Sequence, residues 1–214
     1  MANISGISIK AVKHFIGTEG PAYQGNIYIG SKKVAFWSQD GNGGPDWFDM
    51  MNGFSKKKLV EVMRPYVTQE DAELGIIDES FMCKLVWLVQ AEKKFKKALK
   101  KGYKAMMEVT DGFHVANYYY PDVPNCTAEE LFMRPIENNI KGKFFKNAKI
   151  TYHLYKDISD FSIGEPITAA EIHIIEHYSC RKLRLRGFLL FCLENIILTL
   201  EHNNAEEWSE EIIL

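Results

Sequence analysis

The sequence lacks the features that mark disulfide-bonded, exported or membrane-spanning proteins. Its four cysteines, at positions 83, 126, 180 and 192, form no Cys-x-x-Cys pair, so we expect reduced thiols rather than disulfides or a zinc ribbon. The longest apolar run, 187–200, is interrupted by Glu194 and Asn195 and is shorter than the roughly 20 residues that a bilayer span needs. The first residues show no basic segment followed by an apolar run. We therefore expect a cytoplasmic protein without membrane contact.

Motifs for nucleotide binding and nucleophilic catalysis are missing as well. No Gly-x-x-x-x-Gly-Lys-Ser/Thr loop, Gly-x-Gly-x-x-Gly turn or Gly-x-Ser-x-Gly elbow occurs in the chain. The cluster "DGNGGPD" at 40–46 has no lysine after its glycines, and Gly44 and Pro45 stand where a calcium loop needs an oxygen ligand and a glycine. We therefore assign no catalytic residue, metal ligand or cofactor, and we expect this loop to bind neither phosphate nor calcium.

The composition is that of a globular domain. The chain has 214 residues, of which 46% are hydrophobic, and a formal net charge of -2, so it is long enough to bury a core. We expect an α+β fold in which an N-terminal antiparallel three-stranded meander packs with long helices. The meander would form a subdomain over 1–54, continuous with a mainly helical part over 55–214 that contains additional strands.

The meander is predicted from alternating residues. Strands are expected over 7–15 and on both sides of Gly30-Ser31, which suits a two-residue type II′ turn with positive φ at Gly30. Strict alternation places Ile27, Ile29, Val34 and Phe36 on one face. The other face would carry the polar and aromatic side chains, among them Asn26, Tyr28, Lys33, Ala35 and Trp37.

Helices are predicted where the apolar spacing changes to three and four residues. A short helix follows Ser55 and ends near Pro65, and a long one covers 79–108. Strands are expected near 113–120 and 148–156, as additions to the meander sheet, and Thr127 and Glu130 have the spacing of a capping box. A last helical region runs from 168 to about 203, interrupted near Gly187.

A run of lysines in the long helix is the main candidate for partner binding. Seven lysines fall within 93–104 of a chain whose net charge is negative. Such a cluster is either a solvated face that suits the helix dipole or a surface for phosphates or an acidic protein. We select the following as binding residues: Lys93, Lys94, Lys97, Lys100, Lys101 and Lys104. The basic stretch 181–186 would extend this surface if the two helices pack side by side.

Two tryptophans near the glycine cluster form a second candidate. The cluster is either a turn that leaves a strand or a loop that presents side chains to a partner. These side chains would be Trp37, Trp47, Phe48 and the carboxylates of Asp46 and Asp49. Aromatic residues on a rigid hairpin are suitable interface anchors. We include Trp37 and Trp47 among the partner-binding residues.

One possible metal motif lies in the last helical region. His173, Glu176 and His177 form His-x-x-Glu-His, which on a helix places both histidines on one face, as in inverted zincins. A third ligand is not evident, and Cys180 offers an alternative set. The same spacing also arises in a polar stripe of a structural helix. Zinc hydrolysis therefore stays an alternative function.

The segment "GTEGPAYQGNIYIGSKKVAFWSQDGNGG" at 17–44 resembles the N-terminal part of small proteins of phages, plasmids and integrated elements. In those proteins a strand with a "GKK"-like turn leads into an aromatic strand and a "DGxGG" loop. The resemblance covers about the first fifty residues and implies a mobile-element accessory protein that acts against a host defence system. With the lysines, it favours a non-enzymatic binding protein, or inhibitor, of a nucleic acid or nucleoprotein complex. A structural or assembly factor is the other alternative.

Overall fold

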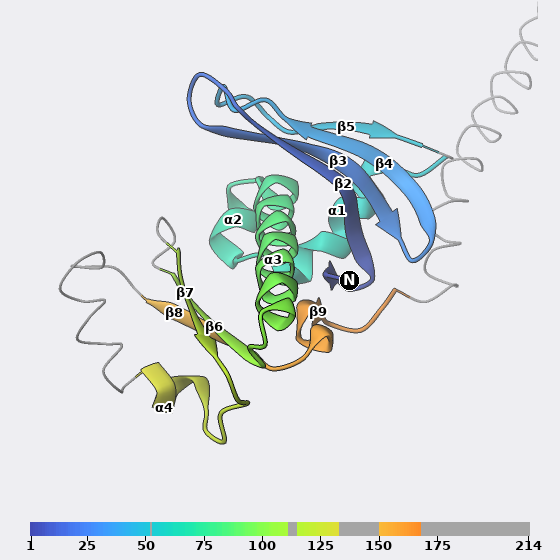
Figure 1. The fold of residues 1–214 in the computed structure, drawn as a ribbon. Coiled ribbons are helices and arrows are strands. Elements are labelled where there is room, and N and C mark those ends of the chain that lie inside the picture. The colour runs from blue at the N-terminus through green and yellow to red at the C-terminus, as the bar shows by residue number, and fades with distance from the viewer. Residues whose placement is uncertain (52, 111–114, 133–149, 168–214) are drawn as a thin grey trace, which may run out of the picture.

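The fold is α+β, with two sheets on either side of a long helix (Figure 1). The computed structural model describes residues 1–51, 53–110, 115–132 and 150–167, and the structural statements below concern these residues. Helices α1 and α3 are the described helices of eight residues or more, so packing against several long helices is not supported here. The expected helical region over 168–203 lies outside the described residues.

The large sheet contains six strands in the order β5-β4-β3-β2-β1-β9. Its strands are β1 (Asn3–Ile4), β2 (Ile7–Ile16), β3 (Pro21–Ile29), β4 (Lys32–Gln39), β5 (Trp47–Met50) and β9 (Ser162–Ile163). All neighbours pair antiparallel except β1 and β9. The predicted meander is confirmed as β2, β3 and β4, and the Gly30-Ser31 turn has φ +59° at Gly30, as a type II′ turn requires.

The prediction that Trp37 shares a sheet face with Tyr28 and Lys33 is wrong. A β-bulge between β3 and β4 leaves Val34 as an extra residue, because Ile27 pairs with Ala35 while Tyr28 pairs with Lys33. The extra residue shifts the alternation, so Ala35 and Trp37 lie on the core side, opposite Ile27 and Gly25. Trp37 is 1% exposed and is therefore part of the core rather than a surface anchor.

Four helices and two 3-10 turns are described, and α3 lies between the two sheets (Figure 1). Their bounds are Lys56–Met63 (α1), Gln69–Glu73 (α2), Ile77–Lys100 (α3) and Ala128–Phe132 (α4), with 3-10 turns at Arg64–Tyr66 (η1) and Ile158–Phe161 (η2). The predicted α1 is confirmed, with Ser55 at its N-cap. Helix α3 contacts β1 and β2 of the large sheet and β6 of the small one.

The predicted end of the long helix at residue 108 is wrong. Helix α3 ends at Lys100, and Gly102 reverses the chain with φ +90°. The next segment, Ala105–Thr110, is the central strand β6 of the small sheet, flanked by β7 (Val115–Tyr120) and β8 (Thr151–Tyr155). All six residues of β6 are buried, so its apolar residues follow each other without the alternation that identifies a half-exposed strand.

The later strands form this separate sheet instead of extending the meander. Strands β7 and β8 were both predicted from the sequence, and both pair antiparallel with β6. The predicted capping box of α4 is confirmed: the Thr127 backbone N–H donates to Glu130 Oε2 at 2.7 Å, and the Glu130 N–H donates to Thr127 Oγ1 at 3.2 Å.

An aromatic cluster joins the small sheet to α3. The Phe161 ring is fully buried and stacks on Tyr155 of β8, with ring centroids 4.3 Å apart. Its other neighbour is Phe95 of α3, at 5.6 Å. Directly after Phe161 the chain forms β9, which pairs with β1 of the large sheet. Phe161 therefore contacts both α3 and the small sheet, while the strand that follows it, β9, belongs to the large sheet.

We expect Phe161→Ala to lower the free energy of unfolding by about 3–5 kcal/mol, the usual range for a buried phenylalanine whose removal leaves a cavity. Urea denaturation followed by circular dichroism measures this change. The control is Phe15→Ala, because Phe15 is 43% exposed and its removal should change stability by less than about 1 kcal/mol. Equal effects of the two substitutions would contradict the assigned role of Phe161.

The buried carboxylate of Asp46 accepts a hydrogen bond from the indole N–H of Trp37. Trp37 Nε1 donates to Asp46 Oδ2 at 2.6 Å, and the other oxygen, Oδ1, is buried without a hydrogen-bond partner in the described structure. Burial raises the pKa of Asp46 from 3.8 to about 6, although the Trp37 hydrogen bond acts in the opposite direction. The folded state thus binds an extra proton between pH 3.8 and about 6.

Because the folded pKa is the higher one, wild-type stability should fall as pH rises from 3.8 through about 6. We expect Asp46→Asn to remove this part of the pH dependence and to be more stable than wild type at neutral pH by up to about 3 kcal/mol. The two proteins should converge below about pH 4. Urea unfolding at several pH values measures both effects, with exposed Asp49→Asn as control. An unchanged pH profile in Asp46→Asn would refute the assignment.

Candidate functional site

The lysines of α3 occupy two adjoining sides of the helix. Lys94, Lys97 and Lys101 are spaced by three and four residues and share one side, since 3.6 residues make a turn. Lys93, Lys96 and Lys100 repeat that spacing one residue earlier and form the neighbouring side. All except Lys94 are exposed, and Lys94 is half-buried. The C-terminal half of α3 therefore carries a broad basic surface, which we call the lysine face.

Ion pairs neutralise only part of the cluster. Lys96 Nζ lies 2.8 Å from Glu92 Oε1, and Lys104 Nζ lies 2.9 Å from Asp122 Oδ1. Within the described ranges, the ion pairs include none of the remaining five lysines of 93–104. Lys104, which we expected in the partner-binding set, thus has an acidic neighbour of its own, and both side chains of that pair are exposed.

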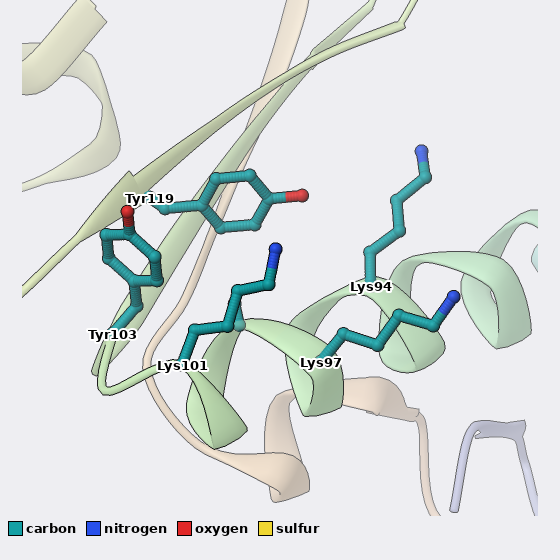
Figure 2. Close-up of a pocket in the computed structure, with 6 residues that line it drawn as sticks. Lys94, Lys97, Lys101, Tyr103 and Tyr119 are labelled. Carbon is teal, nitrogen blue, oxygen red and sulfur yellow. The ribbon is translucent and has the colours of Figure 1, made fainter.

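Three of these lysines line a pocket beside the small sheet. The pocket has a volume of about 240 Å³ and is lined by Lys94, Lys97, Ala98, Lys101, Tyr103 and Tyr119. Figure 2 shows the ammonium ends of Lys94 and Lys101 on the same side of α3 as the Tyr119 ring. The rings of Tyr103 and Tyr119 are 5.6 Å apart between centroids, and the two residues are 37% and 40% exposed. The site combines positive charge with accessible aromatic surface.

The chain reversal after α3 creates this combination. Gly102 adopts φ +90°, a conformation that glycine reaches without a steric penalty. The Lys104 N–H then donates to the Tyr120 carbonyl at 2.8 Å, and Met106 pairs with Tyr119. This pairing brings β7 next to the last turns of α3. Sequence reasoning missed the two tyrosines because Tyr103 fitted the helical spacing, whereas Gly102 was the signal that the helix ended.

The chemistry of the pocket is that of binding. Its polar groups are three ammonium groups and two phenols, which donate hydrogen bonds to anions, while the phenol rings offer stacking surfaces. The six lining residues include no carboxylate, imidazole or thiol. The site therefore has the groups to hold a phosphate or a carboxylate.

The two tryptophans selected as partner-binding residues differ in exposure. Trp47 is 68% exposed on the edge strand β5, whereas Trp37 is buried, as described above. The glycine cluster between them packs on the turn that joins β2 and β3. There the Glu19 N–H donates to the Gly41 carbonyl at 2.9 Å, and a Cβ on Gly41 would lie 2.7 Å from the Gly20 carbonyl oxygen. The cluster thus stabilises a loop contact, and of the two selected tryptophans it is Trp47 that is accessible to a partner.

The possible zinc motif lies outside the described residues, as do Cys180 and the basic stretch 181–186. The structure therefore adds nothing on zinc binding or on a joint basic surface. In the described part, no helix has the length and apolarity needed to cross a bilayer.

Comparisons with protein-family models, with curated proteins and with solved structures find no match to this chain.

Proposed function

We propose that this protein is a non-enzymatic binding protein whose lysine face contacts the phosphate backbone of a nucleic acid, free or within a nucleoprotein complex. The observation that carries the proposal is the pocket in which Lys94, Lys97 and Lys101 meet two accessible tyrosines. Lysines that serve only the helix dipole or solubility need no aromatic neighbours. Positive charge beside stacking surfaces is typical of sites for single-stranded nucleic acids.

The biological setting is part of the same proposal. The resemblance of the first fifty residues favours an accessory protein of a phage or other mobile element, in the host cytoplasm, with a host-defence nucleoprotein complex as the target. Trp47 supports a nucleoprotein target, because a largely exposed tryptophan on an edge strand is suited to contact a protein component. In this arrangement the lysine face holds the nucleic acid and β5 contacts the protein.

Replacing Lys94, Lys97 and Lys101 by glutamine should weaken binding to a labelled oligothymidylate of about 20 nucleotides, measured by fluorescence anisotropy. Each lost phosphate contact lowers the slope of log K against log salt by about 0.7 for a single strand, so the triple variant should lose about 2 from the slope. Tyr119→Ala should weaken binding by about 1–3 kcal/mol while leaving the salt slope nearly unchanged, because it removes stacking rather than charge.

The control replaces three exposed lysines on other elements, Lys13, Lys57 and Lys156, by glutamine. It has the same change in net charge without touching the lysine face. If the control and the triple variant lose affinity and slope equally, binding follows the total charge and the proposed site is wrong. Amide spectra of both variants show whether the fold is retained.

A further inference from the structure

A second cleft, of about 450 Å³, lies between the N-terminal half of α3 and the small sheet. Its volume falls in the range of about 300–1,000 Å³ that is usual for small-molecule sites. Trp87 and Leu88 of α3 line one side, and Glu108 of β6 and His153 of β8 line the other. The pocket lined by Lys94, Lys97 and Lys101 shares no lining residue with this cleft, although α3 contributes to both.

Glu108 is the unusual residue of the cleft. It is 7% exposed on the central strand of the small sheet, and within the described residues no hydrogen bond or ion pair reaches its carboxylate. Burial raises the pKa of Glu108, while the charge of Lys94 acts in the opposite direction. The Glu108 oxygens are not among the fully buried side-chain oxygens that lack a partner within the described part of the chain, so they open to the cleft rather than into the core. A carboxylate that is largely removed from water in this way is stabilised by a donor or a cation.

A second hydrogen-bond acceptor that has no donor among the described residues, Asn117 Oδ1, lies beside Glu108 on the same face of the small sheet. Across the sheet, Glu108 pairs with Asn117 of β7 on one side and with His153 of β8 on the other. Asn117 Oδ1 is buried and also lacks a hydrogen-bond partner in the described structure. Because directly paired residues point to the same face, the two acceptors belong to one row of side chains.

The other charged groups that line the cleft already have partners. Lys84 Nζ donates to the Tyr66 carbonyl at 3.1 Å. Asp160 Oδ2 accepts hydrogen bonds from the backbone N–H groups of Lys156 and Asp157, at 2.6 and 2.9 Å, where it caps η2. The pKa of His153 is lowered by burial and by Lys84, which favours its neutral form. Glu108 therefore stays the charge that a ligand has to neutralise.

The apolar wall indicates what the rest of the ligand is like. Trp87 is 41% exposed although it lies on the helix side that meets the small sheet, and Leu88 beside it is buried. An aromatic face next to a carboxylate favours a cation with an attached apolar body, through cation–π attraction and burial of apolar area.

We propose that this cleft binds a small organic cation, an alkylammonium or arylalkylammonium whose N–H donors pair with Glu108 and whose apolar body packs against Trp87 and Leu88. This site shares no lining residue with the proposed nucleic-acid surface, and its proposal does not rest on that function. Ligand binding places a donor beside the carboxylate that the protein alone leaves without one.

The test is a titration of the full ¹⁵N-labelled chain with phenethylammonium chloride, followed by amide chemical shifts. We expect saturable shifts at residues of α3, β6 and β8 around the cleft. The neutral analogue 2-phenylethanol should bind at least about tenfold more weakly, because it lacks the charge-assisted hydrogen bonds. Glu108→Gln should weaken phenethylammonium binding by a similar factor, and the exposed Glu129→Gln on α4 should leave it unchanged.

Three results would overturn the proposal: shifts that do not saturate, equal affinity for the amine and the alcohol, or full affinity in Glu108→Gln. If Glu108→Gln does not fold, the comparison of amine with alcohol on the wild type decides, together with Trp87→Ala, which should also weaken binding. The double variant Lys97→Gln and Lys101→Gln keeps the Lys94 charge that acts on Glu108, and it should retain amine binding. Glu108→Gln should retain nucleic-acid binding. Failure of one site is therefore distinguishable from failure of the other.

Discussion

The packing of Phe161 between Phe95 and Tyr155 is the contact on which the arrangement of the whole molecule depends. It lies at the end of a short segment that begins at β8 in the small sheet and continues as β9 in the large one. The Ser5 N–H donates to the Ile163 carbonyl at 2.7 Å and fixes this end of the segment. The position of the small sheet against α3, and thus both pockets beside this helix, follows from that attachment.

Helix α3 separates two opposite electrostatic environments along its length. In its C-terminal half, the ion pairs among the described residues include one lysine, Lys96, while its N-terminal half lines a cleft together with the carboxylate of Glu108. Lysines near a helix C-terminus are favoured by the helix dipole, which accounts for part of the cluster at Lys97 and Lys100. The dipole does not account for the tyrosines that line a pocket with Lys94 and Lys101, and these distinguish the pocket from a plain solvated lysine face.

Several elements could be predicted because their signals are contained within a few residues. The φ of Gly30 and the start of α1 after Ser55 depend on local backbone geometry. The capping box of Thr127 and Glu130 depends on hydrogen bonds over three residues. The end of α3 was missed because Tyr103 and Met106 continue the apolar spacing of the helix. A strand that is buried on both faces, as β6 is, has no alternation to distinguish it from a helix.

The sequence by itself determined the α+β composition, the meander and the concentration of lysines on one helix, since each follows from local periodicity or composition. Only the tertiary structure decided which side chains share a site. A single extra residue at Val34 puts Trp37 on the same face as Ile27, in the core, and strand pairing places Glu108 beside Asn117 and His153. The physical reason is that bulges and pairing register depend on the partner strand, which lies elsewhere in the chain and leaves no local signal.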